Sequence, residues 1–248
     1  MRLRAGACAA LASVLLATGC ATPASQRTEV VVYAAASLNS VFTRLGTEFE
    51  ASHPGLSVKF SFDGSATLLD QLSAGAPADV LATADEPTMA KAVTAHLIGG
   101  APTVFATNVL TMIVPAGNPA GITGLDRSLE GRKLVVCADG VPCGSATRKL
   151  AGLLGVTLHP VSEETKVTDV RAKVETGQAD AGIVYVTDAR ASGDAVESIP
   201  IAHADQARND YLIAVPTSAT QPVAAAQFIE FVTGSSGRTA LADAGFGG

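Results

Sequence analysis

The chain has 248 residues, of which 48% are hydrophobic, 16% are charged and 4% are aromatic. This length suits one or two domains, and the apolar fraction is too high and the charge too low for a disordered chain. Seventeen Lys and Arg against 23 Asp and Glu give a formal net charge of −6, and the sequence has no Trp. The basic residues are scattered, so the charge pattern of a nucleic-acid-binding protein is missing and we expect no nucleic-acid partner.

The first 20 residues have the pattern of an export signal. Two arginines precede an apolar run that is shorter than the roughly 20 apolar residues of a membrane-spanning helix. The run ends in Leu16–Cys20, which resembles a bacterial lipobox except that Ala17 stands where Leu is usual. We therefore expect residues 1–19 to be a cleaved signal peptide and Cys20 to be lipidated. Residues 20–28 would then tether the protein to the cell membrane, facing the extracytoplasmic (periplasmic) space. An ordinary export signal with an incidental cysteine is the alternative.

Cys137 and Cys143 are an isolated pair in an exported protein. Oxidising compartments favour disulfides, and the two cysteines flank a short segment with Asp-Gly and Pro that is typical of a tight turn. A zinc site is the other possibility, but it needs four ligands, and no histidine or second cysteine pair lies nearby in the sequence. We therefore expect a disulfide between Cys137 and Cys143.

From Glu29 onward, short apolar strands alternate with amphipathic helical patterns. In the first series, strands are predicted at 29–35, 56–62 and 78–84, and helices at 38–51, 67–75 and 86–95. In the second series, strands are predicted at 109–115, 133–138, 181–186 and 211–216, and helices at 145–155 and 168–178. Residues 221–245 read as two helices with no strand between them. Such alternation indicates an α/β protein built from βαβ units, with parallel sheets covered on both faces.

Each of the two series is large enough to form its own core. We expect the chain to cross between two lobes near 106–109 and 210–217. The first lobe would then comprise residues 29–107 and 217–248, and the second residues 108–216. Two lobes joined by two crossing strands leave a cleft, and open α/β sheets bind ligands beyond the carboxyl ends of their strands.

The sequence lacks the usual catalytic patterns. It has no GxxxxGK[ST], no HExxH and no GxSxG, and its four histidines lie at expected helix ends or in loops, away from any recognisable nucleophile. Adjacent carboxylates are explained by solvated faces or helix starts. We therefore expect a protein that is not an enzyme and that needs no cofactor.

Small or hydroxylated residues stand directly before several predicted helices, as in AAASLNS, DGSATLLDQ, PCGSATRKL and KVTDVRAKV. Ser and Thr are common N-caps, so ordinary capping is one explanation. The other is that several helix N-termini converge on the cleft, where their free backbone N–H groups would form an anion site.

These same segments resemble a known family. AAASL (34–38), GSATL (64–68), GAPADV (75–80), VPCGSATRKL (141–150) and TDVRAKVETGQADAGIVY (168–185) are similar, in order and spacing, to the periplasmic molybdate-binding proteins of ABC transporters. The resemblance implies a periplasmic-binding-protein fold of type II, with two α/β lobes that close on a tetrahedral oxyanion. It also implies molybdate or tungstate as the transported ligand, and a membrane permease with its ATPase as partner. We expect such a protein to act as a monomer.

The resemblance assigns five ligand contacts. Ser37 and Ser65 match serines that offer a hydroxyl and an amide. Cys143 and Val170 match positions that give a backbone amide, and Tyr185 matches a tyrosine whose hydroxyl reaches the ligand. Molybdenum would be held only as the bound oxyanion, with no protein ligand on the metal itself.

Some alternatives stay open at this point. Ser37 and Ser65 could be plain N-caps, and Tyr185 could simply extend its hydroxyl to water. Asp63 stands where the family usually has a small neutral residue, and we expect its carboxylate to point away from a dianion. The ligand could be another tetrahedral anion, such as sulfate or phosphate. A less favoured alternative is an anion-processing enzyme on the same lobes.

Overall fold

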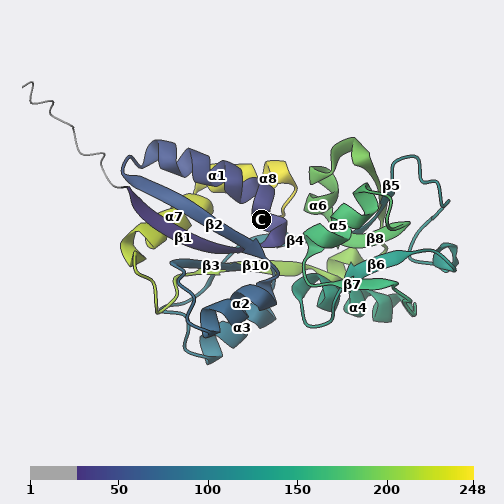
Figure 1. The fold of residues 1–248 in the computed structure, drawn as a ribbon, viewed down its shortest axis with the longest axis horizontal. Helices are drawn as coiled ribbons and strands as arrows, with labels where there is room; N and C mark the ends of the chain where they lie inside the picture. The colour runs from purple at the N-terminus through teal and green to yellow at the C-terminus, as the bar shows by residue number, and fades with distance from the viewer. Residues whose placement is uncertain (1–26) are drawn as a thin grey trace, which may run out of the picture.

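A computed structural model describes residues 27–248, which form two α/β lobes lying side by side (Figure 1). The expected signal peptide and the lipidation at Cys20 lie outside these residues. Within the described part of the chain, no helix is both long enough and apolar enough to cross a bilayer.

The first lobe has a five-stranded sheet in the order β2-β1-β3-β10-β4. Its strands are β1 (Thr28–Ala35), β2 (Leu56–Asp63), β3 (Val80–Thr83), β4 (Thr103–Asn108) and β10 (Asn209–Ala214). Its helices are the short 3-10 helix η1 (Ala36–Leu38), α1 (Asn39–Ser52), α2 (Ser65–Ser73), α3 (Glu86–Thr94), α7 (Pro222–Thr233) and α8 (Ser235–Ala244). The terminal helices therefore return to the first lobe, as predicted.

Helices cover both faces of this sheet. One core cluster packs the apolar sides of α1, α7 and α8 against the strands, and a second cluster packs α2 and α3 against the other face. In α1 the predicted apolar stripe is buried, with Phe42, Leu45 and Phe49 fully inside. The helix ends at Ser52, just before Pro54 and a left-handed Gly55, because proline cannot extend it and glycine tolerates the turn.

The second lobe has a five-stranded sheet in the order β7-β6-β8-β5-β9. Its strands are β5 (Leu110–Pro115), β6 (Leu134–Cys137), β7 (Ser162–Glu164), β8 (Ala181–Tyr185) and β9 (Val196–Pro200). Its helices are α4 (Pro142–Leu154), α5 (Val167–Glu175) and α6 (Val186–Ala191), with short 3-10 helices η2 (Arg127–Leu129), η3 (Gly193–Ala195) and η4 (Ala204–Ala207).

Both sheets are mixed, which corrects the expectation of parallel sheets. The βαβ pairs β1–β2, β1–β3, β6–β7 and β6–β8 are parallel, whereas β10 runs antiparallel to β3 and β4, and β5 runs antiparallel to β8 and β9. Strands β4, β7 and β9 were not predicted, although residues 106–109 were expected to cross between the lobes. All three are edge strands, and none has the continuous apolar run that marks a buried strand.

The crossing segments also differ from the expectation. Strands β4 and β10 pair with each other in the first sheet, with Asn108 opposite Asn209. The chain enters the second lobe at Val109, but it has already returned to the first lobe by Asn209, before the expected crossing at 210–217. Residues 209–214 therefore do not belong to the second lobe, because they pair with β3 and β4, and residues 215–216 pair with the first-lobe segment around Ile98.

Candidate functional site

A small cavity of about 20 Å³ lies where the two lobes meet. The first lobe lines it with the ends of β1 and β3, with η1 and with the start of α2. The second lobe lines it with the starts of α4 and α5 and the end of β8. Four of the five residues predicted to contact the ligand are in this lining, namely Ser37, Ser65, Cys143 and Tyr185.

Helix N-termini converge on the cavity, as the hydroxyl-rich segments predicted. Helix α2 begins directly after Gly64, α4 directly after Val141 and α5 directly after Lys166, and in none of the three does a side chain cap the end. The first N–H groups of a helix have no partner within it and lie at the positive end of its dipole. Three such ends around one cavity favour a bound anion.

Val170 is not among the residues that line the cavity, and its side chain is fully buried in the core of the second lobe. Its predicted role concerns the backbone amide alone. At the start of α5 the Lys166 carbonyl accepts its hydrogen bond from the Asp169 amide and not from the Val170 amide, so a contact between the Val170 amide and the ligand stays a prediction. Val167 lines the cavity, and α5 begins one residue before the predicted start, Thr168.

Ser65 has a specific partner rather than a capping role. Its side chain is 1% exposed, it is the first residue of α2 after the N-cap Gly64, and its Oγ accepts a hydrogen bond from the Ala84 amide at 3.0 Å. Ser37 lies within η1, and its Oγ is hydrogen-bonded to the Tyr211 hydroxyl at 2.9 Å. Neither serine is a plain N-cap.

Tyr185 is buried and does not extend to water. Its side chain is 1% exposed, and its hydroxyl accepts a hydrogen bond from Asn209 Nδ2 at 3.0 Å. Burial raises the pKa of the Tyr185 hydroxyl well above its ordinary value, with the nearby Tyr211 acting in the same direction. The hydroxyl therefore keeps its proton at neutral pH and can donate it.

The carboxylate of Asp63 is directed elsewhere, as expected. Its Oδ1 accepts a hydrogen bond from the Gly64 amide at 2.8 Å and lies 3.8 Å from Lys166 Nζ in the opposite lobe. Asp63 is absent from the cavity lining, and within residues 27–248 no Asp or Glu lines this cavity. The lobes also approach closely here, because a Cβ at Gly64 would clash with the Thr165 carbonyl oxygen.

The two cysteines form the expected disulfide beside the cavity. Cys137 ends β6, Cys143 lies in the first turn of α4, and both are buried. The bond occupies the Cys143 side chain, while the Cys143 amide remains among the unpaired N–H groups at the start of α4. The zinc alternative is excluded, because both sulfurs are used in the disulfide.

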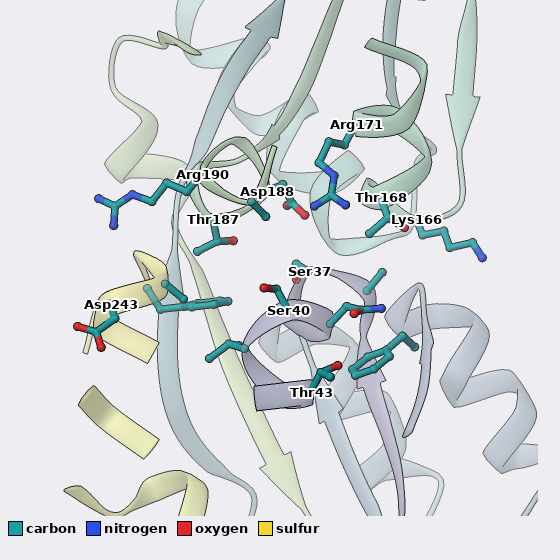
Figure 2. A pocket seen from close by; sticks show the side chains of 17 residues that line it. Ser37, Ser40, Thr43, Lys166, Thr168, Arg171, Thr187, Asp188, Arg190 and Asp243 are labelled. Atoms are coloured by element: carbon teal, nitrogen blue, oxygen red, sulfur yellow. The ribbon is translucent and has the colours of Figure 1, made fainter. Parts of the chain in front are cut away.

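A wider groove of about 790 Å³ lies next to the cavity and shares Ser37 and Lys166 with it. Figure 2 shows its polar side chains, with Ser40 and Thr43 from the first lobe facing Thr168, Arg171 and Asp188 from the second. Burial raises the pKa of the Asp188 carboxyl to about 7, against the lowering effect of the Arg171 guanidinium.

Sequence reasoning missed three polar residues behind the cavity. Asn108, Asn209 and Tyr211 are buried where the lobes join, and each makes side-chain hydrogen bonds to residues of the site or its surroundings. None of the three lies in a recognisable motif. Asn108 is the last residue of β4 and Asn209 the first residue of β10, and Tyr211 resembles any aromatic residue of a buried strand.

A two-lobed fold with an interlobe cavity lined by N–H and O–H donors defines a solute-binding protein. Residues 30–247 match the family model described as bacterial extracellular solute-binding protein. The chain belongs to this family and, within it, to the ModA group. It is thus an extracytoplasmic binding protein and not an enzyme.

Several curated relatives carry the name "Molybdate-binding protein ModA", and two of them illustrate the range of similarity. The one from Mycobacterium tuberculosis (strain ATCC 25618 / H37Rv) is 45% identical over 246 residues, which cover 96% of this chain and 94% of the relative. The one from Escherichia coli (strain K12) is 33% identical over 175 residues, which cover 66% of this chain and 68% of the relative.

Solved structures share the fold. The periplasmic molybdate-binding protein of Azotobacter vinelandii has a TM-score of 0.76 at 19% identity, covering 88% of this chain and 98% of that one. The sulfate-binding protein SubI from Mycobacterium tuberculosis H37Rv has a TM-score of 0.72 at 24% identity, covering 89% of this chain and 86% of that one. At these identities the likeness shows the two-lobed fold alone.

Proposed function

We propose that this protein captures molybdate outside the cytoplasm and delivers it to the membrane permease of an ABC transporter, which works with its ATPase. The observation that supports this most is the interlobe cavity, where helix N-termini and hydroxyls from both lobes face one small space with no lining carboxylate. The 45% identity to a molybdate-binding relative over nearly the whole chain supports the choice of ligand.

The donors suit a dianion that only accepts hydrogen bonds. The proposed contacts are the hydroxyls of Ser37, Ser65 and Tyr185 and the amides of Cys143 and Val170, and Val167 lines the cavity beside them. A hydrogen bond to a charged group contributes about 1.5–3 kcal/mol. Several of them, less the costs of desolvation and ordering, are enough for binding at roughly micromolar concentration or below.

The same donors select among tetrahedral anions. Protonated phosphate carries an O–H that needs an acceptor, and a cavity of donors offers none, so its binding is opposed. Sulfate has the charge of molybdate but a smaller radius, which leaves fixed donors too far from its oxygens. Tungstate is nearly the size of molybdate, and we expect it to bind as well.

Membrane attachment belongs to the same proposal. Lipidation of Cys20 would hold the binding protein, as a monomer, at the membrane that contains its permease. Replacing Cys20 with Ser should release the protein from the membrane fraction of the producing cell. Retention of that variant on the membrane would contradict lipidation at this residue.

Calorimetry on the mature protein tests the ligand. We expect tight binding of molybdate and tungstate, and much weaker binding of sulfate and phosphate. Ser65→Ala and Tyr185→Phe should each weaken molybdate binding by about tenfold or more, the effect of losing one hydrogen bond to a charged group. Tight sulfate binding, or no molybdate binding, would overturn the assignment.

A further inference from the structure

We propose that Asn209 is a positioning residue that commits the Tyr185 hydroxyl to donate into the interlobe cavity, an inference that rests on the proposed function. Asn209 begins β10, where the chain has just returned from the second lobe, and its side chain is 7% exposed. It does not line the cavity but lies directly behind a residue that does.

The hydrogen bonds fix the orientation of the Asn209 amide. Its Nδ2 lies 2.8 Å from the Ala84 carbonyl oxygen, which can only accept, so the nitrogen and not the oxygen must face this side. The same nitrogen lies 3.0 Å from the Tyr185 hydroxyl. The Pro142 carbonyl oxygen lies farther away, at 3.5 Å. An amide nitrogen has two protons, so the two shorter contacts receive them, one at Ala84 and the other at Tyr185.

This donation determines where the Tyr185 proton points. A hydroxyl has one proton and two lone pairs, and the bond from Asn209 occupies a lone pair. The proton must therefore go to another acceptor. The neighbouring Tyr211 hydroxyl is hydrogen-bonded to Ser37 Oγ at 2.9 Å and accepts a longer contact from Asn108 Nδ2 at 3.5 Å. A dianion in the cavity is a much stronger acceptor than this neutral hydroxyl.

Ser65 is arranged in the same way on the opposite lobe. Its Oγ accepts from the Ala84 amide at 3.0 Å, which leaves its own proton for the cavity. Ala84 thus donates behind one site hydroxyl, while its carbonyl oxygen orients the Asn209 amide behind the other. With an N–H donor behind each of these two hydroxyls, Ser65 and Tyr185 present protons and not lone pairs to the ligand.

Asn209 also links the lobes. Its Nδ2 reaches Ala84 at the end of β3 in the first lobe and Tyr185 at the end of β8 in the second. The bond to Tyr185 therefore depends on how the lobes are placed, which ties the donor orientation to the arrangement seen here. A residue that only stabilised the crossing strand would have no such effect on the ligand.

A double-mutant cycle tests this role. Asn209→Leu removes the donor with little change in volume, and we expect it to weaken molybdate binding by about five- to tenfold. If Asn209 acts through the Tyr185 hydroxyl, the same change in a Tyr185→Phe background should weaken binding by less than about twofold. Losses that simply multiply would overturn the proposal, because they would show that Asn209 acts independently of Tyr185.

Two further variants separate this effect from damage to the fold. Asn118→Ala removes an amide that bonds Ile122 in a loop of the second lobe, and it should leave molybdate affinity unchanged. If Asn209→Leu does not fold, Asn209→Ala removes the donor in the same cycle without adding a charge or an acceptor for the Tyr185 proton.

The outcome is distinguishable from failure of the proposed function. If the wild-type protein bound sulfate tightly and not molybdate, the ligand assignment would be wrong. The same cycle measured with sulfate would then still test whether Asn209 acts through Tyr185.

Discussion

At the scale of single residues, the site depends on which protons are available and where they point. The cavity hydroxyls of Ser65 and Tyr185 each accept an N–H hydrogen bond, whereas nearby carboxylates are paired away from the cavity. Asp63 bonds the Gly64 amide and faces Lys166. Asp79 of the GAPADV segment accepts hydrogen bonds from the amides of Val31, Thr220 and Gln221. It therefore connects β1 to the segment before α7 and does not contact the ligand.

Asp188 gives a prediction at this scale. Its pKa of about 7 in the folded protein exceeds the ordinary aspartate pKa of 3.8, so the folded state binds an extra proton between these values and the unfolding free energy falls as pH rises through that window. Three pKa units correspond to about 4 kcal/mol as an upper bound. Asp188→Asn lacks this titration, so its unfolding free energy relative to wild type should rise from pH 4 to pH 8.

Urea unfolding at several pH values measures the difference. Asp205→Asn, at an exposed position in the same lobe, controls for the loss of one negative charge. A difference between Asp188→Asn and wild type that stays constant with pH would show that Asp188 does not titrate in this window.

At the scale of elements, the start of α4 is held by a covalent bond. The Cys137–Cys143 disulfide joins the end of β6 to the first turn of the helix whose amides face the cavity. Replacing both cysteines with Ser should lower the unfolding free energy by about 2 kcal/mol, the value for so short a loop. Molybdate binding should also weaken, because the Cys143 amide loses its fixed position.

Reduction provides the control for this prediction. A thiol reductant should reproduce both effects in the wild-type protein and change nothing in the double variant, when unfolding and calorimetry are measured in parallel. A fall in stability with unchanged affinity would mean that the disulfide does not position the amide.

At the scale of the whole molecule, ligand binding depends on how closely the lobes meet. Gly64 has an ordinary negative φ of −59°, so an Ala there is compatible with its own lobe, but its Cβ would clash with the Thr165 carbonyl of the other lobe. Overpacking of this kind costs about 1–3 kcal/mol. Gly64→Ala should therefore weaken molybdate binding by about tenfold while the unfolding free energy of the unliganded protein stays near the wild-type value.

Calorimetry and small-angle scattering with and without molybdate check this prediction. Gly152→Ala is the matched control, because a Cβ at that position in α4 would meet nothing within 4 Å. Equal affinities for the two variants would show that the contact between Gly64 and Thr165 is not needed for binding.

Local sequence patterns predicted most of the helices and strands and four of the residues that line the cavity. Hydrophobic periodicity predicted most strands and helices, and the small, hydroxylated helix starts predicted converging N-termini. These are local properties, since periodicity and capping act over a few residues. The motif resemblance then placed Ser37, Ser65, Cys143 and Tyr185 together, and the structure lines one cavity with all four.

Strand pairing, the lining of the cavity and the side-chain hydrogen bonds of the site depend on residues far apart in the chain, and only the folded structure shows them. Strand β10 reads like any apolar strand, and only its pairing with β3 and β4 assigns it to the first sheet. Likewise, Val167 lines the cavity only because α5 packs at the junction of the lobes, and Asn209 has a role only because Ala84 and Tyr185 lie next to it in different lobes. Hydrogen bonds between residues far apart in the chain leave no local pattern in the sequence. The orientation of the donors at this site is therefore visible only in the folded molecule.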